Sequence, residues 1–393
     1  MMKVIKSNTL FDGISERKDI FVGIEGDEIK YVGNSKPSEN YEIILEQEEE
    51  QAKDNHNIVV TPAFIDPHSH IGMVRSGEPS KEEEANEQMN SIYPLVNALH
   101  SIYMDDPSFS ESVGSGVLYS VVLPGSGNVI GGKAVLIRNF VQDISQAYIK
   151  DVGVKAALGF NPRSTIDWKG NRPSTRMGAV AMLRENFIKA RKMQRLVQAE
   201  KKVIDEAEPI TEVFMDILSG KYKMMFHVHK EDDIMVLLEL VKEFGIKEAI
   251  ANHCLDVHRK EVFETLRDAS IPIIYGPMDA FPYKVELKHE SWKNVDILLK
   301  SAAKFSLMSD HPVILQRNIF YSLRHLLRFG LSRAQAISKI TKEPAEIIGA
   351  HNIIGQVKPG FKASMVIWND DPFSLASHPI LVIAEGKAVY EEK

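Results

Sequence analysis

The sequence predicts an α/β protein: a (β/α)8 TIM-like barrel with a small β-sandwich domain formed by both chain termini. In the middle of the chain, short and nearly continuous apolar stretches alternate with amphipathic stretches, which indicates a parallel sheet covered by helices on both faces. At both ends, short alternating strands are separated by Gly and Pro turns, and neither end is long enough to bury a core alone. The 393 residues suffice for one large domain and one smaller domain.

The terminal strands come first and last in the chain. Residues 19–33, "DIFVGIEGDEIKYVG", alternate apolar and polar side chains around a Gly-Asp turn, and residues 35–57 are polar and acidic, as in a solvated loop or strand edge. The segments "GQVKPGFKASMVIWNDDP" and "PILVIAEGKAVYEEK" close the chain in the same style. We therefore assign residues 1–60 and 351–393 to the sandwich and residues 61–350 to the barrel.

In the barrel region, we locate strands and helices from the spacing of apolar residues along the sequence. Strands are predicted at residues 116–124, 131–139, 153–160, 223–229, 248–254, 271–277 and 305–310. Helices are predicted at residues 178–206, 231–244, 258–268, 291–303, 316–329 and 332–340. Residues 73–112 are polar and broken by prolines, which suggests a lid over the barrel mouth.

The composition narrows the functional classes. The formal net charge is −7, and an acidic chain without a basic stripe is a poor nucleic-acid binder. The one cysteine permits no intrachain disulfide, which fits a reducing compartment. We see neither a signal peptide nor an apolar run of the roughly 18 residues that a membrane helix needs. We expect a cytoplasmic protein that binds a small-molecule substrate but neither nucleic acid nor membrane; a homo-oligomer remains possible.

Side chains that bind metals end several of the predicted strands. They are His68 and His70, His227 and His229, His253, and Asp310. In such barrels the carboxyl ends of the strands carry the chemistry, and residues two apart in a strand point the same way. A lone histidine is more often a structural residue, and Asp310 in "SDHP" also suits a helix cap. The combination nevertheless indicates one metal centre, and imidazole with carboxylate suits Zn²⁺, with iron or manganese nearly as suitable.

At this point the chain resembles the metal-dependent amidohydrolase superfamily, most closely its imidazolonepropionase-like branch. "TPAFIDPHSHIGM" is similar to the first-strand motif of that superfamily. Further similar stretches are "PGSGNVIGGKAVLIR", "ALGFNPR", "RPSTRMGAVAMLRENF", "FHVHKEDDI", "ITKEPAEIIGAHNIIGQVKPGFKASMVIWNDDP" and "EGKAVYE". The resemblance covers nearly the whole chain and implies a metal-holding barrel with a sandwich built from both termini.

The resemblance also implies roles for single residues. His68 and His70 match the first-strand metal ligands, and His227 matches the fifth-strand ligand. His229 is then a neighbour that binds substrate or replaces His227. His253 matches the sixth-strand histidine, which binds a second metal or contacts substrate. Asp310 matches the eighth-strand aspartate, which touches metal and relays protons.

One departure from the family pattern concerns the fourth strand. Binuclear members place a bridging glutamate or carbamylated lysine there, and relatives of this branch tend to read Gly-Glu-Asn-Pro where this chain has Phe160 after Gly159. Lys155 on the same strand, or Lys133 on the preceding one, would supply the bridge if carbamylated. A binuclear site, a single-metal site and an inactive relic therefore all remain open.

The predicted function is metal-dependent hydrolysis of an amide or cyclic-amide C–N bond, with Asp310 as proton relay and His253 as a second catalytic group. Alternatives are a mononuclear deaminase that releases ammonia and a non-catalytic binding protein. Arg163, Arg172 and Arg176 follow the fourth strand closely, and we expect Arg163 and Arg176 to hold a substrate carboxylate. The competing interpretation is a loop folded by arginine–carboxylate pairs.

Overall fold

The computed structural model describes residues 1–38, 40–45, 57–164 and 170–392, and the strands of these residues form two eight-stranded sheets. One sheet contains the strands of both termini and the other forms the barrel. A single residue, Ala63, separates β5 (Val59–Pro62) of the terminal sheet from β6 (Phe64–Ser69) of the barrel. The chain thus passes from one sheet into the other just before the first two histidines.

The barrel strands follow one another in chain order around the sheet. They are β6, β7 (Val117–Val122), β8 (Ile130–Arg138), β9 (Tyr148–Ala157), β10 (Lys223–Val228), β11 (Ala249–His253), β12 (Ile273–Tyr275) and β13 (Phe305–Leu307). The two edges of the sheet approach each other beyond β13, where Asp310 donates its backbone N–H to the carbonyl of His68 at 3.1 Å. The barrel is therefore nearly closed, and the backbone hydrogen bond between its two edges brings together His68 and Asp310, which are both predicted site residues.

The third strand departs from the predicted all-parallel barrel. β8 runs antiparallel to both β7 and β9, whereas the other neighbouring pairs are parallel. The connection over residues 123–129 is shorter than the roughly dozen residues that a parallel crossover needs. This Pro- and Gly-rich stretch forms a hairpin instead, and only the short α2 (Ile144–Ala147) separates β8 from β9.

Helices cover the outer side of the barrel, and all except those at residues 209–219 and 342–347 lie close to where the hydrophobic period predicts them. They are α4 (Arg176–Gln198), α5 (Pro209–Ser219), α6 (Glu231–Phe244), α7 (Lys260–Asp268), α8 (Asn294–Ser301), η6 (Gln316–Ser322), α9 (Leu323–Arg328), α10 (Arg333–Ser338) and α11 (Lys342–Ile347). In α6 the buried face is Ile234, Leu237, Leu240 and Phe244, and the left-handed Gly245 ends the helix. The helix predicted at 178–206 ends early, at Gln198.

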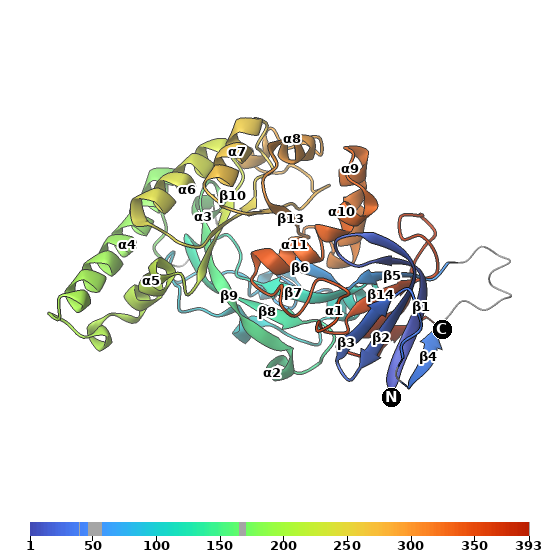
Figure 1. Ribbon diagram of the computed structural model, residues 1–393. Coiled ribbons are helices and arrows are strands. Elements are labelled where there is room, and N and C mark those ends of the chain that lie inside the picture. Colours follow the sequence, from blue (N-terminus) through green and yellow to red (C-terminus); the bar gives the residue numbers. More distant parts are fainter. Residues whose placement is uncertain (39, 46–56, 165–169, 393) are drawn as a thin grey trace.

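The terminal sheet joins both ends of the chain, as predicted. Its remaining strands are β1 (Met2–Phe11), β2 (Glu16–Glu25), β3 (Glu28–Gly33), β4 (Tyr41–Leu45), β14 (Met365–Trp368), β15 (Pro379–Ala384) and β16 (Lys387–Glu391). β5 pairs with β1 on one side and β14 on the other, so both termini lie beside this sheet, far from α4 and α5 (Figure 1). Of the acidic stretch predicted as a loop or strand edge, residues 41–45 form β4, and residues 46–56 lie outside the described part of the chain.

The segment predicted as a lid contains η2 (Ser80–Glu82), η3 (Ala98–Ser101) and α1 (Pro107–Gly114). Isolated bridges pair Ile92 with Ile130 and Asn97 with Lys133, both at the beginning of β8. Because β8 runs backwards, its beginning lies at the end of the barrel where β7 stops. Residues 92–97 therefore run along the rim of the barrel at the end that carries the histidines.

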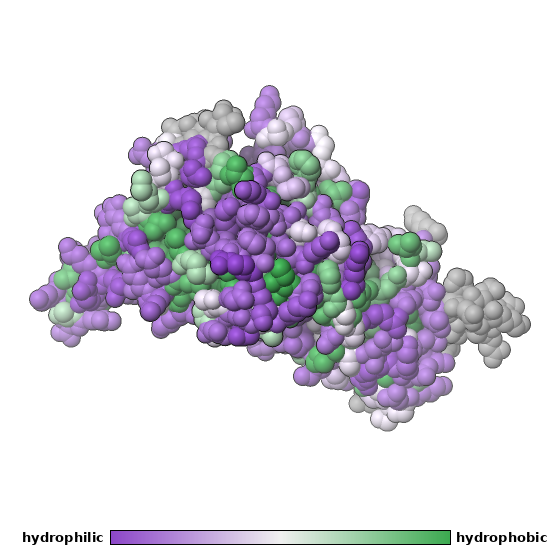
Figure 2. Space-filling view, turned by 90° about the horizontal axis from the view of Figure 1, so that it is seen from above, coloured by the Kyte–Doolittle hydropathy of each residue, from purple (hydrophilic) through white to green (hydrophobic). Residues whose placement is uncertain are grey.

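The surface shows no broad apolar belt on the face seen from above, where hydrophobic side chains occur in small groups among hydrophilic ones (Figure 2). Among the helices of the described residues, none has the length and apolar character needed to cross a membrane.

Candidate metal centre

The first-strand histidines meet the eighth-strand aspartate at the end of the barrel. The Nε2 atoms of His68 and His70 lie 3.2 and 3.3 Å from Oδ1 of Asp310. These three side chains can offer one ligand atom each within 4.8 Å of one another. Asp310 follows β13 with a left-handed φ of 52°, a conformation that non-glycine residues adopt at a cost and that often marks functional sites.

A second group lies beside the first. His227, His229 and His253 also bring one possible ligand atom each within 4.8 Å. The ring of His253 lies 4.4 Å from that of His227 and 4.8 Å from that of His68, measured between centroids. His253 therefore stands between the two His-x-His pairs. The structure thus brings together all six metal-binding residues that the sequence predicts.

Lys155 lies in the same place and is completely buried on β9. Its Nζ is 3.2 Å from Nε2 of His68. Burial is the main cause that lowers the pKa of this amine to about 7, so much of it is neutral near physiological pH. Lys133, the other lysine considered for a bridge, lies over the ring of Tyr222 instead, with its Nζ 5.3 Å from the ring centroid.

Three of the histidines are held so that one ring nitrogen faces the centre. Nδ1 of His68 contacts Oδ1 of Asn252 at 3.1 Å, Nδ1 of His70 contacts the carbonyl of Leu123 at 2.7 Å, and Nδ1 of His253 contacts the carbonyl of Gly276 at 2.9 Å. All three partners are oxygen acceptors, since the amide nitrogen of Asn252 donates to the carbonyl of Phe226. Each Nδ1 therefore carries the proton, and each Nε2 presents a lone pair to the centre.

This arrangement fits a bound cation. The Nε2 lone pairs of His68 and His70 face the carboxylate of Asp310 at hydrogen-bonding distance, with no proton of their own to share. Burial lowers the pKa of His68 to about 3 and holds that of His253 well below its usual value, so these rings are neutral. Both ring nitrogens of the buried His229 lack a partner among the described residues. Electron-rich atoms that converge in this way match the donor set of Zn²⁺ or a similar metal.

Sequence reasoning missed one residue of the centre. Glu286 lies in η5 (Val285–Leu287), between β12 and α8, and is buried. Its Oε1 lies 3.2 Å from Nε2 of His227 and 3.8 Å from Nε2 of His229. Burial opposes ionisation, but hydrogen bonding with His227 and the nearby Lys284 hold the pKa of Glu286 well below its usual value. Oε2 of Glu286 accepts the backbone N–H of Phe160 at 3.0 Å. A carboxylate from another segment therefore lies beside the position where related sequences have a glutamate and this chain has Phe160.

Asp66 is a second residue that the sequence did not single out, although it stands in the same "DPHSH" stretch. It is fully buried and accepts the backbone N–H groups of His68 and Ser309 and the side-chain amide of Gln316. Burial raises its pKa to about 6. Because Ser309 precedes Asp310, this carboxylate ties the first strand to the eighth and sets the spacing of the ligands on both.

The arginines predicted to bind substrate lie next to the centre rather than in it. Arg163, in α3 (Asn161–Ser164), and Arg176 line one cavity of about 550 Å³ together with Gly159. Nε of Arg176 donates to Asp233 at 2.7 Å. Nε of Arg163 donates to the carbonyl of Gly159 at 3.3 Å, and its guanidinium lies 5.7 Å from the centroid of the Phe160 ring. Residues 165–169 of the predicted arginine loop lie outside the described part of the chain. Among the described residues, Arg176 has a carboxylate partner and Arg163 has none.

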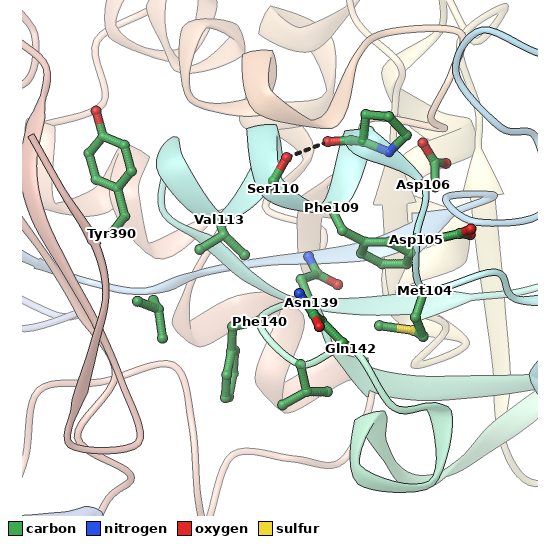
Figure 3. A pocket seen from close by; sticks show the side chains of 13 residues that line it. Met104, Asp105, Asp106, Phe109, Ser110, Val113, Asn139, Phe140, Gln142 and Tyr390 are labelled. Carbon is green, nitrogen blue, oxygen red and sulfur yellow. Dashed lines mark hydrogen bonds between the residues drawn. The ribbon is translucent and has the colours of Figure 1, made fainter.

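A different cavity, of about 680 Å³, lies between α1, the residues that follow β8, and β16. Side chains of Phe109, Val113, Phe140 and Tyr390 line it, with Asn139 at the end of β8 (Figure 3). Cavity size alone would make it a candidate site. It contains none of the histidines, however, so the chemistry points to the strand ends described above.

Comparison with known proteins agrees with this geometry. The model of the amidohydrolase family matches residues 59–389. An amidohydrolase from Thermotoga maritima MSB8 is 28% identical, with a TM-score of 0.89 over 99% of this chain and 100% of that chain. A prolidase complexed with N-methylphosphonate-L-proline is 13% identical, with a TM-score of 0.63 over the full length of both chains. At that identity the prolidase supports the fold alone.

Among curated proteins, the amidohydrolase TasK of Hapsidospora irregularis is 24% identical over 360 residues. The aligned region covers 85% of this chain but 36% of TasK, so this chain spans about a third of that relative's length.

Proposed function

The chain belongs to the amidohydrolase family, whose members are hydrolases acting on carbon–nitrogen bonds, and on that premise we propose that it is a metal-dependent hydrolase of an amide or cyclic-amide bond in a small molecule. The observation that carries the proposal is the convergence of two ligand groups, one around His68, His70 and Asp310 and one around His227, His229 and His253. Their neutral imidazoles and single carboxylate are a donor set for divalent metals.

The proposed centre holds two ions. His68, His70 and Asp310 would bind one, and His227 with His253 would bind the other. Carbon dioxide would add to the neutral Nζ of Lys155 and release a proton to water, which leaves a carbamate between the two groups. Zn²⁺ is our first choice, and iron or manganese suits these ligands nearly as well. An ion held there lowers the pKa of a bound water from about 15.7 toward 7 and polarises the carbonyl of the scissile bond.

The protein's own groups move the protons and hold the charge. Asp310 would accept the proton of the attacking water and deliver it to the leaving nitrogen, which needs a carboxylate within hydrogen-bonding reach of both. His229 would donate a hydrogen bond to the oxyanion that develops on the carbonyl oxygen. His229 suits this role because its ring nitrogens have no other partner among the described residues.

The substrate class is a compound that carries a carboxylate near the scissile bond. Arg163 supports this proposal, because its guanidinium lines a cavity that adjoins the centre at Gly159. A Cβ built on Gly159 would lie 2.9 Å from Oε2 of Glu286, whose other carboxylate oxygen lies 3.2 Å from Nε2 of His227. The prolidase neighbour was solved with a ligand that contains proline. N-acylated amino acids and dipeptides are therefore the first compounds to assay.

A direct experiment tests the proposal. The protein is stripped with a chelator, reloaded with Zn²⁺ or Mn²⁺ in the presence of bicarbonate, and incubated with a panel of N-acyl amino acids, dipeptides and cyclic amides. We expect metal-dependent release of a carboxylate and an amine. Release of ammonia would instead identify the deaminase alternative, and a loaded protein that cleaves nothing in the panel would count against hydrolysis.

A further inference from the structure

We propose that Glu286 is a positioning residue for the metal centre: it fixes the protonation of His227 so that this histidine faces the metal through Nδ1. The inference rests on the proposed function insofar as it assumes a metal at His227. It adds a residue from outside the strand ends to the centre, and it assigns His227 the opposite ring orientation from His68, His70 and His253.

The contacts of the His227 ring carry the inference. Nε2 faces the carboxylate of Glu286 at 3.2 Å, whereas the buried Nδ1 has no partner among the described residues. An ionised carboxylate only accepts hydrogen bonds, so the nitrogen that faces it carries the proton. The other nitrogen of a neutral ring then keeps its lone pair. Metal-bound histidines are commonly oriented by a carboxylate on the opposite nitrogen in this way.

The carboxylate of Glu286 is itself held from several sides. Oε2 accepts the backbone N–H of Phe160 at 3.0 Å, at the end of the fourth barrel strand. Oε1 forms an ion pair with Lys284 at 3.1 Å, and only 2% of the Glu286 side chain is exposed. This buried charge cannot turn away without losing its contacts with Phe160, Lys284 and His227. The geometry of Glu286 is therefore fixed before a metal binds.

Glu286 is not itself a ligand in this proposal. Its ion pair with Lys284 places a positive charge close to Oε1, which disfavours a second cation on the same oxygen. His227 has an unpaired nitrogen available for that cation, whereas the carboxylate already has its partners. The same loop presents Phe281, Tyr283 and Val285 to solvent, with 79%, 64% and 65% of their surfaces exposed. A single segment thus contributes both surface side chains and a buried contact to the metal ligand.

The test follows the ring nitrogens of His227 directly. Protein labelled with ¹⁵N-histidine is compared by NMR in its metal-free and Zn²⁺-loaded forms, and His227→Asn assigns the signals. We expect Nε2 of His227 to be protonated in both forms. Protonation at Nδ1 in the metal-free protein would overturn the proposal, as would loss of the Nε2 proton on loading, because then Nε2 and not Nδ1 would face the metal.

Substitutions supply the second readout. In Glu286→Ala we expect mixed protonation of His227 and a 10- to 100-fold weaker affinity for one ion, measured by chelator competition, while the ion at His68 and His70 binds as before. If the alanine variant fails to fold, Glu286→Gln, which keeps the size of the side chain and removes its charge, replaces it in both measurements. Glu290→Gln, a change on the same loop, is the matched control and should leave both readouts unchanged. Wild-type protonation and affinity in both Glu286 variants would refute the inference.

Neither readout requires turnover. A protein that binds metal and keeps Nε2 of His227 protonated, yet cleaves no amide, would contradict the proposed function and leave the role of Glu286 intact.

Discussion

The two His-x-His pairs have the same spacing in the sequence and differ in almost everything that surrounds them. His68 and His70 each hold an oxygen acceptor on Nδ1 and both face Asp310 through Nε2. In the second pair, His227 contacts a carboxylate through Nε2 and leaves Nδ1 without a hydrogen bond, and neither ring nitrogen of His229 has a hydrogen-bond partner among the described residues.

This difference shows that the motif alone does not define the role of its members. In the first pair a neutral oxygen atom on Nδ1 orients each ring, and we propose both rings as ligands. In the second pair only His227 has a hydrogen-bonding oxygen beside its ring, the carboxylate of Glu286, so we propose His227 as the ligand and His229 as a substrate contact. The variants below test this division, from the largest expected effect to the smallest.

Removing a member of the first pair should abolish the centre. For His68→Asn we expect loss of bound metal and a fall in kcat/KM of at least about 10⁴-fold, because metal chemistry supplies a large part of an enzymatic acceleration of roughly 10⁶-fold or more. Elemental analysis and the amide assay measure the two effects. A variant that keeps its metal and most of its activity would show that the first pair is not a ligand pair.

Replacing the shared carboxylate separates metal binding from proton transfer. In Asp310→Asn we expect much of the metal to remain, because the histidines are unchanged, while kcat falls about 10²- to 10⁴-fold through loss of the proton relay. Metal content and turnover are measured on the same sample. Full activity in a metal-loaded variant would exclude Asp310 as the relay.

The second pair should respond unequally to the same substitution. His227→Asn should lose one ion, whereas His229→Asn should keep both and lower kcat/KM by about 10- to 150-fold, the cost of about 1.5–3 kcal/mol for a hydrogen bond to a charged group. Equal loss of metal in both variants would mean that both histidines of the second pair bind metal, as we propose for the first pair.

The smallest effect is expected beside the centre. Arg163→Gln should raise KM for a carboxylate-bearing substrate by about tenfold or less, because a partly exposed ion pair is screened by water. Arg176→Gln is the control: its guanidinium pairs with Asp233, so KM should hardly change. A larger rise in KM for Arg176→Gln than for Arg163→Gln would reverse this assignment of the substrate contact.

The ligands were predictable because their signal is local. A strand places residues two apart on the same side, and parallel strands bring their carboxyl ends together, so His68, His227, His253 and Asp310 could be placed in one centre from the sequence. Lys155 was a candidate for a different reason, since the resemblance to binuclear amidohydrolases implies a bridging residue on the fourth strand. Most helices that cover the barrel were also found near their predicted positions, because hydrophobic period depends on neighbouring residues alone.

The remaining features depend on contacts between distant segments. Glu286 lies in an irregular polar stretch without periodicity, and nothing local indicates that its carboxylate reaches His227, 59 positions away in the chain. Asn252 precedes His253 and, by simple alternation, should point away from it, yet it contacts His68 across the barrel. The reversed β8 had a signal, since the "PGSGN" turn is too short for a crossover, but the apolar strand itself does not reveal its direction.

The central claim is that both pairs belong to one binuclear centre joined through Lys155. Metal content per chain, measured by elemental analysis after reloading with Zn²⁺ and bicarbonate, tests it most directly. We predict about two ions per chain in the wild-type protein and about one or fewer in Lys155→Ala, since a two-metal site needs its bridge. A single ion in the wild-type protein, or the same content in both proteins, would contradict the claim.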